Sequence, residues 1–229
     1  MDIWEANSIS TALTPHVCNR AGQTMCTTDV ECGAGDGNRY AGNCDKDGCD
    51  FNPYRQGNQS YYGPDGIVDT SQPMTVVTKF ITADGTDSGR LSEIQRVYVQ
   101  GGQVIQQSVS NIEGIDDTNA ISDEFCAQQK DVFGDTNGFA DRGGMQAMGD
   151  SFDNGMVLVM SIWDDYTARM LWLDAPYPPD ADPEAPGVAR GTCSPDSGYP
   201  EEIESQYSDA TVTFSNVKFG ALGSTYEAS

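Results

Sequence analysis

The sequence predicts an all-β domain, a mostly antiparallel sandwich with long loops and a few short helices. Its 229 residues suit one domain, because sandwiches often run to roughly 250 residues. Its 25 glycines and 11 prolines separate short apolar runs, which favours strands and turns over long helices. In 211–220 the two faces of the chain alternate with a two-residue period, as in a strand. These three observations carry the prediction.

The strands are expected after a long stretch of loop. Residues 15–70 are predicted to be mostly irregular. Within 94–108, Gly101 and Gly102 can form the turn of a hairpin. The strand candidates are 74–81, 94–108, 156–163 and 211–220.

Two short helices and a long loop complete the chain. The helix over 122–133 has Ser122 as its N-cap and Gly134 as its closing glycine. A shorter helix is predicted over 142–149. The proline-rich segment 174–191 suits neither a helix nor a strand. Long loops in compact domains usually serve a function.

The composition excludes several kinds of partner. A formal net charge of −23 repels nucleic-acid phosphates and anionic membranes. No apolar stretch approaches the roughly 20 residues that a membrane-spanning helix needs. A neutral substrate is compatible with so acidic a chain. We therefore expect neither nucleic acid nor a membrane as partner.

Seven cysteines indicate an oxidising compartment and hence a secreted, extracellular protein. No Cys-x-x-Cys pair occurs, which argues against a zinc site and favours disulfides over metal ligation or reduced thiols. Because seven is odd, at least one cysteine lacks a partner in this chain. The sequon at Asn58 fits a secreted glycoprotein.

Two carboxylates, Asp2 and Glu5, stand in the first strand-like run. In a regular strand their odd spacing puts them on opposite faces. A bulge between them would let both line one cleft, and bulges are common beside active sites. The alternative is two solvated acids on a strand.

The segment NCDKDGCD partly matches a calcium-binding loop. Its asparagine and aspartates fit the EF-hand pattern, but the last position falls on Tyr54, where Glu is required. Two cysteines inside the segment argue further against calcium. We expect no metal and no cofactor.

Five long segments carry a family resemblance: MDIWEANSISTALTPHVC, NRYAGNCDKDGCDFNPYRQGN, MVLVMSIWDDYTARMLWLD, GVARGTCS and VTFSNVKFGALGST. They resemble glycoside hydrolase family 7, the fungal cellobiohydrolases and endoglucanases. The resemblance implies a concanavalin-like β-sandwich (jelly roll). In the family motif Glu-x-Asp-x-x-Glu, Asp2 and Glu5 take the last two places, and the first Glu would stand before Met1. Residues 1–229 are therefore expected to be a single catalytic domain that lacks its N-terminal half.

The resemblance also implies catalytic roles. Glu5 would be the acid/base of a retaining glycosidase, protonated before attack. Asp2 would orient the nucleophile, and His16 would bind near the leaving-group sugar. Since the nucleophile would precede Met1, the chain by itself is expected to be inactive.

Further residues are implied in substrate binding. Trp163 and Trp172 would stack on sugars on opposite sides of the cleaved bond, and Tyr166 would lie at a loop tip. Sequence alone also allows core tryptophans and a solvated loop face. The resemblance implies six more binding residues: Arg39, Asp47, Asp50, Arg55, Tyr177 and Arg190. The charged residues among them would surround the product-side sugars.

The same resemblance implies three disulfides and an unpaired Cys193. The implied pairs are Cys18–Cys44, Cys26–Cys32 and Cys49–Cys126.

The function expected from the resemblance is hydrolysis of cellulose β-1,4 bonds with retention. The loop 174–191 and the segment around Arg39 favour a processive cellobiohydrolase that releases cellobiose from reducing ends. An endoglucanase of the same family is the first alternative. A lectin-like sandwich that binds glucan without cutting it is the second. The partners would be a cellulose chain and cellobiose, and the protein is expected to be a monomer.

Overall fold

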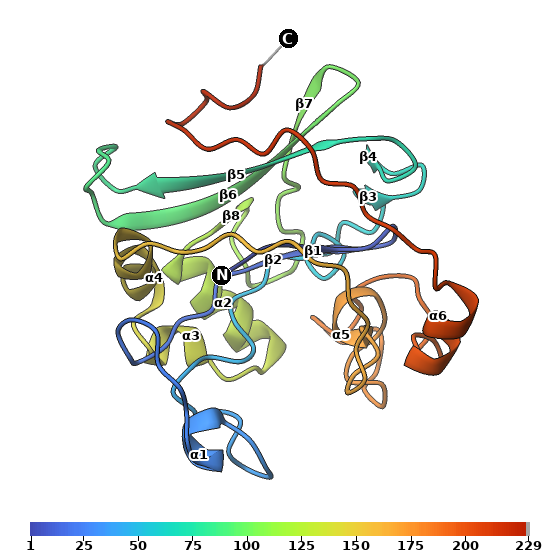
Figure 1. The fold of residues 1–229 in the computed structure, drawn as a ribbon, viewed down its shortest axis with the longest axis horizontal. Coiled ribbons are helices and arrows are strands. Elements are labelled where there is room, and N and C mark those ends of the chain that lie inside the picture. The colour runs from blue at the N-terminus through green and yellow to red at the C-terminus, as the bar shows by residue number, and fades with distance from the viewer. Residues whose placement is uncertain (228–229) are drawn as a thin grey trace.

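Antiparallel pairing around β6 builds the largest sheet of the computed structural model, which describes residues 1–227 (Figure 1). The strands are β1 (Asp2–Ala6), β2 (Thr11–Thr14), β3 (Tyr62–Gly63), β4 (Val68–Asp69), β5 (Thr75–Thr82), β6 (Leu91–Gln100), β7 (Gln103–Gln106) and β8 (Ala120–Ile121). The helices are α1 (Asp29–Cys32), α2 (Asp123–Phe133), α3 (Gly138–Asp141), α4 (Gly144–Asp153), α5 (Leu171–Asp174) and α6 (Pro200–Gln206).

The four-stranded sheet has the order β5-β6-β7, with β8 also paired to β6. β5 pairs with β6 from Thr75↔Val99 onward, and β6 turns into β7 at the predicted hairpin. Gly101 and Gly102 both have positive φ, 56° and 78°, as a two-residue turn of this kind requires. The predicted strands at 74–81 and 94–108 are therefore present, although β7 ends at Gln106.

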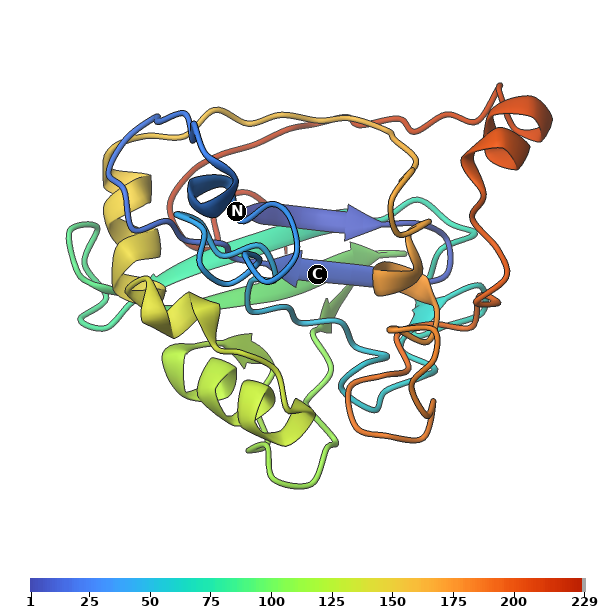
Figure 2. The same cartoon turned by 90° about the horizontal axis from the view of Figure 1, so that it is seen from below.

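A second, two-stranded sheet of β1 and β2 lies against one face of β6 (Figure 2). Leu13 of β2 and Ile94 of β6 belong to one buried core cluster. The hydroxyl of Tyr98 reaches Thr11 Oγ1 at 3.5 Å across the same interface. These contacts make two facing layers, with the candidate catalytic strand in the smaller one.

Helix α2 begins and ends where the sequence predicts. The Ser122 side chain accepts a hydrogen bond from the Phe125 N–H, and Gly134 closes the helix in a left-handed conformation. Phe125 stacks on Phe51 with ring centroids 5.2 Å apart. The second helix runs from Gly144 to Asp153 and so begins and ends later than predicted.

Two predicted strands, 156–163 and 211–220, are wrong. Both segments are irregular and cross the molecule without joining a sheet among the described residues (Figure 1). Their apolar side chains face solvent: Val157 is 89% and Val159 is 77% exposed. A two-residue period favours an extended chain, but a strand also needs hydrogen-bonding neighbours.

Three disulfides cross-link the described residues. They join the pairs that the resemblance implies, Cys18–Cys44, Cys26–Cys32 and Cys49–Cys126, and Cys193 has a free thiol. Only the third pair is buried, where it ties the loop after β2 to α2. In residues 1–227, the helices are too short or too polar to cross a membrane.

We expect the buried disulfide to contribute most to stability. Replacing both Cys49 and Cys126 by Ala should lower the free energy of unfolding by about 2–4 kcal/mol, because this bridge constrains the longest loop, with a sequence separation of 77. Denaturant unfolding measures the loss. The matched control replaces Cys26 and Cys32, whose separation is 6, and should cost less. An equal or larger loss from the control pair would contradict this ranking.

Candidate active site

A bulge in β1 brings the two N-terminal carboxylates into one site. Asp2 pairs with Thr14 and Glu5 pairs with Ala12, so three steps along β1 match two along β2. The extra residue changes which face the following side chain takes. This is the irregularity that the odd spacing of Asp2 and Glu5 requires if both are to serve one cleft.

His16 fixes the position of Asp2. Its Nε2 lies 2.8 Å from Asp2 Oδ2. Its Nδ1 lies 2.9 Å from the Asp45 carbonyl, and since a carbonyl only accepts, Nδ1 carries a proton. The imidazole is therefore clamped between a backbone acceptor and a carboxylate, which sets the direction of both side chains.

The Asp2–His16 pair is charged over a defined pH range. Burial alone would raise the pKa of Asp2, but the hydrogen bond and charge of His16 lower it below 3.8. Burial alone would lower the pKa of His16, but the hydrogen bond and charge of Asp2 raise it above 6.5. The pair therefore stabilises the fold fully between those values. Its contribution is lost as pH falls through the lowered pKa of Asp2 or rises through the raised pKa of His16.

Glu5 has the opposite electrostatics. Burial, followed by the negative charge of Asp2, raises the pKa of Glu5 to about 7. The charges of His16 and of the amino terminus act against this rise, and the charge of Asp50 adds to it. A carboxyl with this pKa is protonated under mildly acidic conditions and can donate a proton in a reaction.

A second cluster of charges is centred on Arg55. Its guanidinium bonds Asp50 at 2.5 Å and Asp135 at 2.8 Å and lies 4.4 Å from the centroid of the Phe133 ring. Burial would raise the pKa of Asp50, but the charges of Arg55 and then Arg190 lower it. Asp50 is thus an ionised, paired carboxylate.

Arg190 and Arg39 approach this cluster from two loops. Arg190 is partly buried, and its Nη1 donates to the Trp172 carbonyl at 3.3 Å. Burial and the neighbouring charge of Arg55 lower the pKa of Arg190 to about 10. Arg39 is more exposed and forms an ion pair with Asp47. Four of the five charged residues implied at the product side thus fall into two ion-pair groups, and Arg190 lies beside the second.

Tyr177 lies between these two groups. Its ring centroid is 5.6 Å from the Arg190 guanidinium carbon. The same phenol also lies within electrostatic range of Arg39. The loop 174–191, on which Tyr177 and Arg190 both stand, therefore joins the implied product-side residues.

The implied aromatic residues lie close to one another. Trp163 and Trp172 stack with ring centroids 6.3 Å apart. Trp172 Nε1 donates to Asp165 at 3.0 Å. Tyr166 is exposed and donates to the Glu204 carboxylate. Their roles in sugar binding stay predictions.

The sequence analysis missed the residues that fasten the site together. Asn52 Nδ2 lies 3.0 Å from the Ser10 hydroxyl and from the Leu173 and Arg190 carbonyls. Asn7 donates to Asp174 at 2.6 Å. These bonds tie the loop after β1 to the segment around α5. These partners are 42 to 167 residues apart, and such distant pairs leave no local signal in a single sequence.

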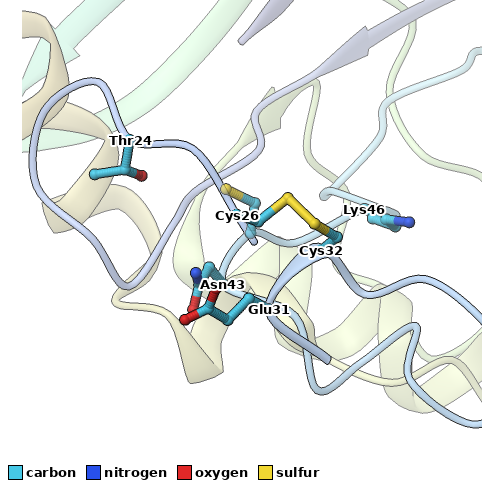
Figure 3. Close-up of a pocket in the computed structure, with 7 residues that line it drawn as sticks. Thr24, Cys26, Glu31, Cys32, Asn43 and Lys46 are labelled. Carbon is cyan, nitrogen blue, oxygen red and sulfur yellow. A yellow bond between two sulfur atoms is a disulfide. The ribbon is translucent and has the colours of Figure 1, made fainter. Parts of the chain in front are cut away.

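A pocket of about 470 Å³ borders the product-side cluster, between Arg55, Asn111 and the proline-rich loop. Another pocket, of about 120 Å³, surrounds the Cys26–Cys32 disulfide (Figure 3). Its carboxylate, Glu31, is bound by Thr27. Residues 1–227 contain no cluster of three metal-ligating side chains.

Comparisons with known proteins show the family of this chain. A family model described as glycosyl hydrolase family 7 matches residues 1–226. A cellobiohydrolase of this family from Daphnia pulex is 50% identical with a TM-score of 0.95, over 98% of this chain and 51% of that chain. A cellobiohydrolase from Melanocarpus albomyces, solved with cellotetraose, is 41% identical with a TM-score of 0.89, over 99% and 50%. An endocellulase from Humicola insolens is 36% identical with a TM-score of 0.73, over 90% and 46%. The chain spans about half the length of these structures.

The protein's single histidine makes the Asp2–His16 pair directly measurable. NMR titration should give His16 a pKa above 6.5, because Asp2 stabilises the imidazolium. Changing Asp2 to Asn should bring that pKa to or below 6.5, since burial remains and the charge is gone. Changing the exposed Asp87 to Asn is the matched control and should leave it in place. Identical titration curves for all three proteins would exclude the pair.

Proposed function

Because the chain belongs to glycosyl hydrolase family 7, we propose that it supplies the acid/base side of an active site that hydrolyses cellulose β-1,4 bonds with retention. The observation that carries the proposal is the bulge in β1, which brings the partly buried Glu5 to the same site as the Asp2–His16 pair. The raised pKa of Glu5, about 7, agrees with it. Glycoside cleavage by acid catalysis needs one protonated carboxyl group and one ionised carboxylate. Glu5 and Asp2 fit these two requirements.

In the proposed mechanism Glu5 acts twice. It first gives its proton to the glycosidic oxygen as the bond breaks, and then removes a proton from the water that releases the sugar. Burial favours the protonated form before the first step. Asp2, held by His16, keeps a negative charge near Glu5 and so contributes to that raised pKa.

Retention also needs a nucleophile on the opposite side of the sugar, about 5–5.5 Å from the acid. The carboxylates that raise the pKa of Glu5 are Asp2 and Asp50. Asp2 is bonded to His16 and Asp50 to Arg55, so neither is free to attack. We therefore expect Glu5 to work with a carboxylate that the described residues do not provide, in a complete concanavalin-like sandwich, and expect the chain alone to be inactive.

The product-side cluster favours release of cellobiose from reducing chain ends. Tyr177 and Arg190 on the loop 174–191 meet Arg55 and Arg39, and guanidinium groups bond paired sugar hydroxyls well. Arg190 Nε is buried and has no acceptor, which leaves a donor for a ligand. The two cellobiohydrolases are more similar to this chain than the endocellulase is, which supports the same choice. The disulfides support secretion.

Two alternatives remain distinguishable. An endoglucanase would release longer oligosaccharides, so product analysis separates it from a cellobiohydrolase. A glucan-binding protein without catalysis would have no need of a protonated carboxyl. The raised pKa of Glu5 therefore favours an enzyme.

The direct test joins this chain to the N-terminal half of the Daphnia pulex relative, whose remaining length this chain does not cover. The joined protein should release mainly cellobiose from cellulose, and the 229-residue chain alone should not. Changing Glu5 to Gln in the joined protein should reduce the rate on cellulose by about 10²–10⁴-fold, because the general acid is lost. Aryl cellobiosides with good leaving groups should be affected least in the bond-breaking step.

Changing Glu113 to Gln, far along the chain, is the matched control and should preserve activity. Robust hydrolysis by the chain alone, or full activity after the change at Glu5, would require another assignment of the acid and the nucleophile.

The product-side cluster predicts a change in product inhibition. Changing Arg190 to Ala in the joined protein should raise the inhibition constant for cellobiose at least severalfold, since a hydrogen bond to a charged group contributes about 1.5–3 kcal/mol. Changing the exposed Arg20 to Ala should not. Inhibition kinetics with added cellobiose measure both. An unchanged constant in the Arg190 variant would make these charges a solvated or structural cluster.

A further inference from the structure

Arg96 is a buried cation in the layer opposite the catalytic strand. It stands in the middle of β6, where it pairs with Thr78 of β5, and is 2% exposed. Its Nε and Nη1 have no hydrogen-bond partner. No carboxylate of residues 1–227 forms an ion pair with it. Its surroundings are aromatic, with the Tyr98 ring centroid 5.7 Å from the guanidinium carbon.

Among the described residues outside β6, the Arg96 side chain makes one hydrogen bond: its Nη2 donates to the carbonyl of Ile3. Ile3 lies between Asp2 and Glu5, inside the bulge of β1. The Arg96–Ile3 hydrogen bond therefore connects the larger sheet to the β1 bulge, which brings Asp2 and Glu5 together.

The neighbouring strand cannot supply this donor. Leu13 of β2 lies opposite the bulge, but its N–H donates to the Phe51 carbonyl at 3.2 Å. Its carbonyl accepts from the Phe51 N–H at 2.9 Å. Both backbone groups of Leu13 thus point away from β1, and a bulge leaves its extra residue outside the regular ladder.

Stability gives no reason for an arginine at this position. Burial of a cation without a counter-ion destabilises a fold, and an apolar side chain of similar length would fill the same space at lower cost. Burial lowers the pKa of Arg96, in keeping with that penalty. An uncompensated charge of this kind calls for another role.

We propose that Arg96 is a positioning residue that holds the β1 bulge from the opposite sheet and thereby fixes Glu5 in its proton-donating place. The assignment of proton donation rests on the proposed function, whereas the positioning can be measured without turnover. Arg96 acts through the Ile3 carbonyl. The titratable groups that act on Glu5 itself are Asp2, His16, Asp50 and the amino terminus. Those that face Arg96 are the neutral phenols of Tyr61, Tyr62 and Tyr98.

The test is the carboxyl pKa of Glu5, followed by ¹³C NMR in the 229-residue chain with labelled glutamate and assigned with Glu5→Gln. In Arg96→Met the pKa of Glu5 should fall from about 7 by about one unit or more, because the freed bulge exposes the carboxyl to water. Arg96→Lys keeps one donor and the charge, and should restore most of the value. Thr78→Val, a change at the paired position that removes a buried hydroxyl without a partner, should leave it unchanged.

A chemical variant tests the same bond without touching Arg96. Ligation of a synthetic peptide covering residues 1–17 to a chain beginning at Cys18 allows an ester in place of the Ile3–Trp4 amide, which weakens the Ile3 carbonyl as an acceptor. This ester should lower the pKa of Glu5 in the same direction as Arg96→Met. An unchanged pKa in either folded protein, or an equal fall in Thr78→Val, overturns the proposal.

Kinetic measurements on the joined protein distinguish a failure of this inference from a failure of the proposed function. In the joined protein, Arg96→Met should lower kcat about tenfold with little change in KM, and the loss should shrink for substrates with good leaving groups. If the parent joined protein does not cleave cellulose, the proposed function fails, and the NMR result still decides whether Arg96 holds the bulge.

Discussion

The bulge in β1 is the constraint on which the rest of the site depends. A regular strand would send either Asp2 or Glu5 between the two sheets, where an ionised carboxylate without a partner is too costly. One extra residue removes that conflict and leaves both acids at the same site. The same irregularity frees the Ile3 carbonyl for Arg96 in the opposite layer. The first five residues therefore determine both how the two sheets contact each other at the site and where the two acids lie.

The carboxyl groups of the site differ in whether a cation is bonded to them. Asp2 is held by His16 and Asp50 by Arg55, and both have lowered pKa values. Glu5 has no cation bonded to it and keeps its proton to about pH 7. Similar acids thus take different roles because their neighbours push their pKa values apart.

Local signals were read correctly from the sequence, and long-range ones were not. The end signals Ser122 and Gly134 act within one turn of a helix, so they locate α2. The strand predicted at 211–220 failed because periodicity indicates an extended chain, while strand pairing depends on distant segments. The Arg55–Asp135 pair joins residues 80 apart, which no pattern in one sequence connects. The family resemblance supplied the residues implied at the product side, and the structure supplied their partners.

The central claim is that burial at the bulge makes Glu5 a proton donor near neutral pH. The most direct measurement is the pKa of the Glu5 carboxyl in the unmodified protein, by ¹³C NMR titration. The account predicts a value of about 7. A value at or below 4.5, the ordinary value for glutamate, would mean that Glu5 is ionised under working conditions and would contradict its role as the acid.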